Sequence, residues 1–70
     1  MSLHPEELAR IVRVLRVVRS DQDNWFDGYE WFMAGCILDR ANEDGRNLAL
    51  SEKERTLIAR LEAKVKELGR

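Results

Sequence analysis

The residue types that most often perform catalysis are scarce in this chain of 70 residues, which holds one histidine, His4, and one cysteine, Cys36. A nucleophilic site needs a base within hydrogen-bonding reach of the nucleophile. His4 lies in a terminal stretch, where mobility is common, and the sequence indicates no cysteine or serine partner for it. Cys36 follows a group of aromatic residues, where a small buried hydrophobic side chain is the expected role. We therefore predict no catalytic residue and a protein that is not an enzyme.

Acidic side chains could hold a cation at two places, Asp21 with Asp23 and Asp39 with Glu43. Pairs of carboxylates are frequent on protein surfaces, so neither pair is specific. The segment "DQDNWFDG" has acids at alternate positions, as a calcium loop does, but it lacks the central glycine and the bidentate glutamate of an EF-hand at their required places. The chain also has no cluster of cysteine and histidine for zinc. The sequence therefore predicts no metal ion and no cofactor.

Four arginines recur at every third position of the first third of the chain: Arg10, Arg13, Arg16 and Arg19. The planar guanidinium group binds a carboxylate or a phosphate through two hydrogen bonds. This row could therefore bind an acidic protein surface or a nucleic acid. The alternative is a solvated helix face, partly neutralised by the aspartates between positions 21 and 27, because exposed charge pairs are common and contribute little.

Overall charge and hydropathy exclude several classes of partner. The chain has 12 basic and 13 acidic residues and a net charge of −1, so there is no global attraction to nucleic acid or to a membrane. No apolar run of about 18 residues could span a bilayer. The start "MSLHPEELAR" lacks the features of a signal peptide, and a single cysteine suits a reducing compartment. We therefore expect a cytoplasmic protein without a membrane partner.

Hydrophobic periodicity predicts an all-α fold: one domain over residues 1–70 with helices at about 5–19, 24–42 and 51–68. Pro5 suits the first position of a helix. Gly45 marks the turn after the second helix, and Ser51 with Glu54 forms a capping box at the start of the third. Gly69 is a candidate C-terminal cap. A chain of this size is only marginally stable alone, which favours oligomerisation.

The second predicted helix is the aromatic-rich one, and we expect it to be the central element. All five aromatic residues fall between positions 25 and 32. One arc of this helix, predicted as its core face, carries Trp25, Tyr29, Phe32, Met33 and Cys36. Trp31 and Leu38 lie seven residues apart on a second apolar stripe, which we predict to be an interface. The alternative is that the first and third helices cover both stripes.

Two sets of residues are predicted to form the interface of a homodimer. Gly28 and Gly35 lie seven residues apart, and each costs a helix about 1 kcal/mol unless something compensates, such as the close approach of another helix. The third helix has apolar residues at the a and d spacing of a coiled coil: Ile58, Leu61, Val65 and Leu68. A twofold dimer would place these identical patches against each other.

These features together predict a small regulatory protein that binds a larger protein and modulates it, by inhibition, as bacterial or phage accessory proteins do. Trp31 and Leu38 would anchor the contact, and the four arginines would steer it. The alternative is a small DNA-binding transcriptional regulator that uses the arginines or the third helix. The segment of about eight residues between the second and third helices is longer than the turn of a helix-turn-helix, and glutamates offset the basic residues of the third helix.

Overall fold

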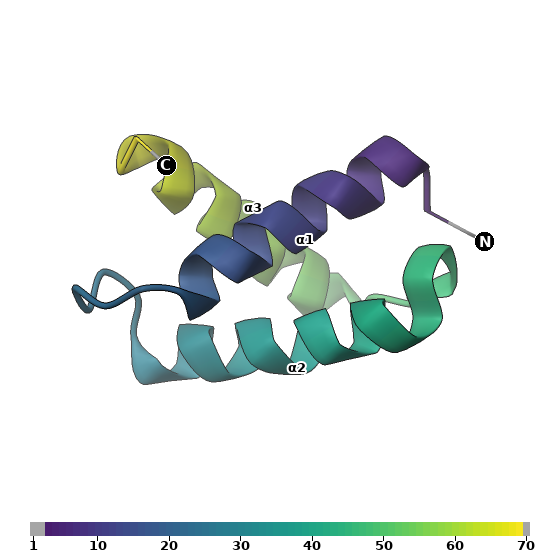
Figure 1. Ribbon diagram of the computed structural model, residues 1–70, viewed down its shortest axis with the longest axis horizontal. Coiled ribbons are helices and arrows are strands. Elements are labelled where there is room, and N and C mark those ends of the chain that lie inside the picture. Colours follow the sequence, from purple (N-terminus) through teal and green to yellow (C-terminus); the bar gives the residue numbers. More distant parts are fainter. Residues whose placement is uncertain (1–2, 70) are drawn as a thin grey trace.

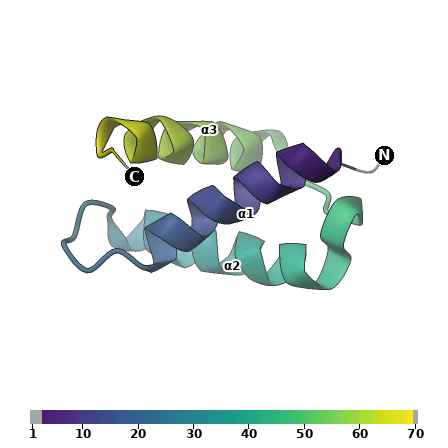
Figure 2. The same cartoon turned by 45° about the horizontal axis from the view of Figure 1, so that its top comes forward.

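A computed structural model describes residues 3–69, which form three α-helices: α1 (Pro5–Arg19), α2 (Gly28–Asp44) and α3 (Glu52–Glu67). A single turn of 3-10 helix, η1 (Gly45–Asn47), follows α2 directly. This part of the chain contains no strand, so the predicted all-α, three-helix fold is confirmed (Figure 1). Figure 2 shows α3 above and α2 below, with α1 running obliquely between them.

The first and third helices begin where the sequence indicates. In α1, Pro5 is the first helical residue, and Nδ1 of His4 accepts a hydrogen bond from the backbone N–H of Glu6 at 3.2 Å. In α3, the backbone N–H of Glu54 donates to the Ser51 hydroxyl at 3.1 Å, and the N–H of Ser51 donates to the Glu54 carboxylate at 2.9 Å. This is the predicted capping box, in which each side chain satisfies a backbone donor of the other residue.

The second helix begins four residues later than predicted, at Gly28 instead of residue 24. Its N-cap is Asp27, whose carboxylate accepts a hydrogen bond from the backbone N–H of Glu30 at 2.7 Å. Glu30 accepts in return from the N–H of Asp27 at 3.0 Å. Several residues before Asp27 could also cap a helix, but only Asp27 has a glutamate three residues later. At its other end α2 extends to Asp44, and Gly45 ends it with a φ of +56°.

The residues that were expected to form the first turn of α2 belong to a loop instead. The Asp21 carboxylate accepts hydrogen bonds from the backbone N–H groups of Asp23 and Phe26, both at 3.1 Å. Asn24 has a φ of +59°, which a right-handed helix does not allow. Phe26 is 7% exposed and belongs to the core. The loop therefore carries one aromatic side chain into the core ahead of the helix.

The core lies where α1 meets the other two helices. The close helix pairings are α1 with α2 and α1 with α3, so α1 takes the central position that was expected for the aromatic-rich helix. The largest fully buried side chains come from all three helices: Leu15, Val18, Ile37 and Leu61.

The apolar residues of α3 that were predicted as a dimer interface belong to this core. Ile58, Leu61 and Val65 are 8%, 0% and 5% exposed, and Leu68 is half-buried against the same cluster. Their heptad spacing aims them at α1 of their own chain. They are therefore not available to a second copy in the folded chain.

Ion pairs connect α2 to α3. The buried Glu30 carboxylate lies 3.7 Å from the Arg60 guanidinium and 3.8 Å from the Lys64 ammonium. Further along, Arg40 pairs with Glu54 and also donates to the Ala49 carbonyl. Because the start of α2 meets the middle of α3, and a later part of α2 meets its start, the two helices run antiparallel.

No helix within residues 3–69 is both long enough and apolar enough to cross a lipid bilayer.

Candidate protein-interaction surface

The side of α2 that packs into the core consists of small or medium-sized residues and one buried acid. Glu30, Ala34, Ile37 and Ala41 are each at most 6% exposed. These residues follow a four, three, four spacing and so lie along one side of the helix. Because alanine has little side-chain volume, this side lets α1 pack closely and leaves no space for aromatic rings.

The large aromatic side chains of this region point outward. Tyr29 is 66% exposed, Phe32 61%, Trp25 48% and Trp31 43%. The predicted core arc was therefore wrong for Trp25, Tyr29 and Phe32, because Ala34 and its neighbours occupy the place between the helices. Of the five aromatic residues, only Phe26 is buried.

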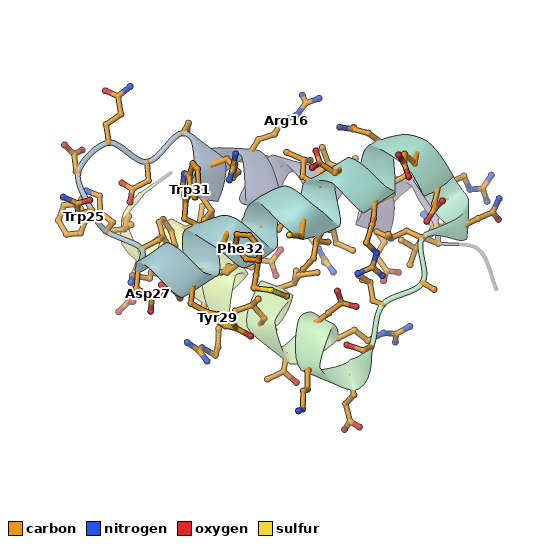
Figure 3. The ribbon with its side chains drawn as sticks, turned by 90° about the horizontal axis from the view of Figure 1, so that it is seen from below. Arg16, Trp25, Asp27, Tyr29, Trp31 and Phe32 are labelled. Atoms are coloured by element: carbon orange, nitrogen blue, oxygen red, sulfur yellow. The ribbon has the colours of Figure 1, made fainter. Side chains whose placement is uncertain are left out.

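Four residues of α2 lie close together on its free side, and we call them the aromatic surface: Tyr29, Phe32, Met33 and Cys36. Their spacing of three, four and seven residues places them on one side of a helix. Tyr29 and Phe32 are exposed, whereas Met33 and Cys36 are half-buried at the edge of the core. Figure 3 shows Phe32 near the middle of this side and Tyr29 turned toward α3.

A shallow hollow continues the aromatic surface onto α3. Tyr29 lines it from α2, and five residues line it from α3: Glu52, Lys53, Thr56, Leu57 and Arg60. The guanidinium side chain of Arg60 is 68% exposed, so it stays accessible although it pairs with Glu30. Apolar side chains thus have an accessible basic group directly beside them.

Trp31, the predicted anchor for a partner, is engaged within the chain. The Arg19 guanidinium lies over its ring, 3.6 Å from the centroid. The indole Nε1–H donates to the Arg19 carbonyl at 3.3 Å, and the Arg19 guanidinium donates to the Trp31 carbonyl at 3.4 Å. This reciprocal contact attaches the end of α1 to α2, so one ring face of Trp31 is already covered.

The two glycines of α2 are in different surroundings. A Cβ added at Gly35 would lie 2.6 Å from Nη1 of Arg19. The space left by the missing side chain of Gly35 is thus filled by the Arg19 guanidinium of the same chain, whereas the sequence predicted the close approach of a second helix. At Gly28, the first residue of α2, nothing lies within 4 Å of an added Cβ.

The predicted set of partner-binding residues is not brought together on one face. Arg10 forms an ion pair with Glu62 of α3 at 3.2 Å, and Arg19 stacks on Trp31 of α2. Arg13 and Arg16 lie between them, exposed, and form no ion pair with any residue of the range 3–69. Leu38 is half-buried against the core. The four arginines therefore do not share one face of α1: the first lies beside α3 and the last lies beside α2.

The histidine and the cysteine that were candidates for catalysis lie in different parts of the structure. His4 caps α1, and Cys36 is a half-buried free thiol. Across residues 3–69, no group of three or more histidine, cysteine, aspartate or glutamate side chains lies close enough to hold a metal ion.

Sequence reasoning missed two features of this surface, and each had an indication in the sequence. The capping box "DGYE" announces both the start of α2 and the role of Glu30. The series Ala34, Ile37 and Ala41 has the period of a helix side and continues back to Glu30. Because this series contains few large hydrophobic residues, hydrophobicity alone favours the aromatic arc as the core face.

Comparisons with known proteins gave no relative for this chain: no family model matches it, and neither the curated proteins nor the solved structures contain a significant match.

Proposed function

We propose that this chain is a small non-enzymatic regulatory protein, which binds a larger protein and modulates it by covering part of its surface. The observation that supports the proposal is the exposure of Tyr29 and Phe32 beside Met33 and Cys36 on one side of α2. Tyrosine, tryptophan, phenylalanine, methionine and arginine are the residues that are enriched in protein interfaces.

The size of the exposed apolar area also favours binding. An aromatic side chain can bury about 150–250 Å². The four exposed aromatics, each 43–66% exposed, therefore offer roughly 400–500 Å² to a partner. This area is not one patch, because Trp25 lies in the loop before α2 and Arg19 covers one face of Trp31. Tyr29 and Phe32 are the part of it that a single contact on α2 could cover.

Folding does not account for this exposure. The core is closed by residues of all three helices and by Phe26, and none of the four exposed aromatics belongs to it. Exposed aromatic rings add a tendency to aggregate, which is a cost unless a partner covers them. We therefore assign the anchoring role to Tyr29 and Phe32, in place of Trp31 and Leu38.

The arginines retain a part in this proposal. Arg13 and Arg16 are exposed and unpaired within the described range, so they can attract an acidic region of the partner. Such charges raise the association rate more than the affinity. Figure 3 shows Arg16 at the upper edge of the view, on the other side of α2 from Tyr29, so its effect on a contact at the aromatic surface acts at long range.

DNA binding is the second candidate, and Arg13 and Arg16 are the residues that support it. Their guanidinium groups could contact two phosphates. On α3, however, Arg60 and Lys64 are paired with Glu30, which weakens the basic field that a recognition helix needs. Retention on duplex DNA at low salt that falls steeply as salt rises would favour this candidate over the first.

Site-specific photocrosslinking tests the proposal. A photoreactive phenylalanine analogue replaces Phe32 in one sample and Arg13, which is also exposed but lies on α1, in the control. In an extract of the organism that encodes the chain, we expect a discrete adduct with one larger protein from position 32 and none from position 13. Loss of that adduct in a Tyr29→Ala background would place the contact on the aromatic surface. Equal adducts from both positions, or none from position 32, would contradict the proposal.

A further inference from the structure

A regular series of side chains runs along the whole free side of α2. Its members are spaced three, four, three and four residues apart: Tyr29, Phe32, Cys36, Asp39 and Glu43. This is the a and d spacing by which two helices pack along their length. All five lie outside the buried side formed by Glu30, Ala34, Ile37 and Ala41, and no helix of the same chain covers them.

The two ends of this series differ in chemistry. The first half is apolar, with Tyr29 and Phe32 exposed and Cys36 half-buried, whereas the second half carries the exposed carboxylates of Asp39 and Glu43. Helix α3 runs antiparallel to α2, so its basic Arg60 lies beside the apolar half, and Tyr29 and Arg60 line the same hollow. The apolar half therefore has a positive neighbour, and the other half is negative.

A surface with these two halves is complementary to itself when one copy is reversed. In an antiparallel pair of α2 helices, Asp39 of each copy can lie against the apolar half of the other and beside its Arg60, with Glu43 beyond the start of the other α2. A twofold axis generates this arrangement, and it makes every favourable contact twice. A foreign protein would have to supply the same pattern by coincidence, whereas a second copy supplies it by symmetry.

We infer that a second copy of this chain covers the aromatic surface, in a twofold dimer of antiparallel α2 helices. The register that satisfies both halves places Phe32 opposite the partner's Cys36 and Tyr29 opposite the partner's Asp39. In this register the partner's Asp39 carboxylate reaches Arg60, whose side chain is 68% exposed. The interface is thus apolar at its centre and ionic at both ends, as stable interfaces commonly are.

The length of α2 fits the area that a dimer needs. In this register residues 28–40 of the two helices lie side by side over about 20 Å. A standard interface buries about 800 Å² on each partner, which is roughly a sixth of the 5001 Å² of accessible surface of this chain. One long helix face, with Tyr29 and Arg60 reaching over its edge, is of that order.

This inference rests on the proposed function only in that both use the aromatic surface. It names what covers the surface when no larger protein is bound. The dimer would then be the resting form, and a larger partner would bind the separated chain. The two proposals can fail independently, because one is tested with the purified chain and the other in an extract.

Sedimentation equilibrium of the purified chain from about 1 µM to 1 mM is the first test. We expect a dimer in the wild type and a monomer in Phe32→Glu, with the same helical circular dichroism, since Phe32 is 61% exposed and lies outside the core. Arg16→Glu, also at an exposed position but on α1, is the matched control and should remain dimeric. A wild type that stays monomeric, or a Phe32→Glu variant that stays dimeric, would overturn the inference.

The ionic ends provide a second measurement. Asp39→Lys should raise the dimer dissociation constant about tenfold, because by symmetry it places two new lysines beside the two Arg60 side chains. Asp44→Lys makes the same change of charge at an exposed site of the same helix, outside the series, and should change the constant less than twofold. Equal effects of the two substitutions would show that the carboxylate end does not meet Arg60, and would overturn the antiparallel register.

Chemical crosslinking at Cys36 tests the register directly. In the proposed dimer the two Cys36 residues are related by the axis, within reach of a short bis-maleimide. We expect rapid formation of a covalent dimer in the wild type and none in Cys36→Ser. A variant that carries Cys36→Ser and Arg13→Cys, with its single thiol on exposed α1, should not crosslink at the same protein concentration. A dimer in sedimentation without crosslinking at Cys36 would mean that another face associates.

Discussion

Helices α2 and α3 both carry a row of large apolar side chains at helical spacing, yet only one of the two rows is inside the molecule. On α3, Leu57, Ile58, Leu61 and Val65 are at most 8% exposed. On α2, Tyr29 and Phe32 are more than 60% exposed, although they are larger. The size of the side chains therefore does not decide which side of a helix is buried.

The difference follows from how each helix meets α1. The side of α2 that faces α1 carries Ala34 and Ala41, and small residues allow two helices to approach closely. On α3 the contact with α1 is made by leucine, isoleucine and valine side chains. Because alanines make the contact with α1, Tyr29 and Phe32 point away from it, and Trp31 contacts only Arg19 at the end of α1. The comparison teaches that an aromatic-rich helix can pack through its small residues and leave most of its rings exposed.

The largest effect that this comparison predicts is a contrast between two truncations. Leu61→Ala, at a fully buried site of α3, should lower the free energy of unfolding by about 3 kcal/mol, because it removes buried contacts and leaves a cavity. Phe32→Ala removes a larger side chain from an exposed site and should cost less than about 0.5 kcal/mol. Urea unfolding followed by circular dichroism, extrapolated to low protein concentration so that self-association does not contribute, measures both.

Ile37→Val, at a fully buried site of α2 itself, is the control for this contrast. It should cost about 1 kcal/mol, more than Phe32→Ala in spite of the smaller change in volume. If Phe32→Ala destabilised the monomer as much as Leu61→Ala, the aromatic surface would be part of the core and the comparison would be wrong.

Enlarging a residue on each side of α2 gives the next largest effect. Ala34 is fully buried against α1, so Ala34→Leu should lower the free energy of unfolding by about 1–3 kcal/mol through overpacking. Cys36→Leu, two positions along on the half-buried edge, should change it by less than about 0.5 kcal/mol. The midpoints of thermal unfolding of the two variants compare the same new side chain on both sides of one helix. Tolerance of leucine at position 34 would mean that α1 and α2 are not closely packed.

Sequence reasoning could predict the parts of the fold that depend on local chemistry. The bounds of α1 follow from Pro5 and from a regular apolar pattern, and the start of α3 follows from the capping box of Ser51 and Glu54. Gly45 and Gly69 have φ values of +56° and +74°, as their expected roles in a turn and a cap require. These features are determined by residues within a few positions of one another.

The buried side of α2 could not be predicted in the same way, because it depends on a helix that is distant in sequence. Hydrophobicity alone favours Tyr29 and Phe32 as core residues, whereas the structure buries Glu30 and Ala34. Glu30 can be buried because its carboxylate serves the capping box and also meets Arg60 and Lys64. Those ion pairs join residues about 30 positions apart, which no local pattern indicates.

A smaller effect concerns the cap that begins α3. The hydrogen bond from the Ser51 backbone N–H, and then the nearby Arg40 guanidinium, hold the pKa of Glu54 below its ordinary value of 4.5. Glu54→Gln should therefore lower the free energy of unfolding by about 1 kcal/mol at neutral pH. A folded-state pKa below the unfolded one gives a stabilisation that is complete above the unfolded value and is lost as the pH falls through the folded value. Urea unfolding at pH 7 and near pH 3 should thus show a difference that shrinks in acid.

Glu52→Gln is the matched control for this pH dependence. Glu52 is exposed, lies in the same first turn of α3, and interacts with the helix dipole without closing a capping box. Its loss should cost about 0.3–0.5 kcal/mol. If Glu52→Gln and Glu54→Gln had equal effects at neutral pH, the stabilisation would come from charge near the helix start and not from the contacts of the Glu54 carboxylate with the Ser51 N–H and Arg40.

The smallest expected effect tests how α1 is attached to the exposed side of α2. At Gly35 an alanine would gain about 1 kcal/mol in helix propensity, but its Cβ would lie 2.6 Å from Nη1 of Arg19 and displace the guanidinium from Trp31. Stacking of this kind contributes about 0.5–1 kcal/mol. Gly35→Ala should therefore change the free energy of unfolding little in the wild type, yet stabilise an Arg19→Ala variant by about 1 kcal/mol. A double-mutant cycle measures this coupling, and an equal effect of alanine in both backgrounds would show that Arg19 does not cover Gly35. If alanine at position 35 stabilises only the Arg19→Ala variant, the role of the glycine is explained. Gly35 then makes space for the Arg19 side chain, which covers one face of Trp31, whereas Phe32 remains uncovered.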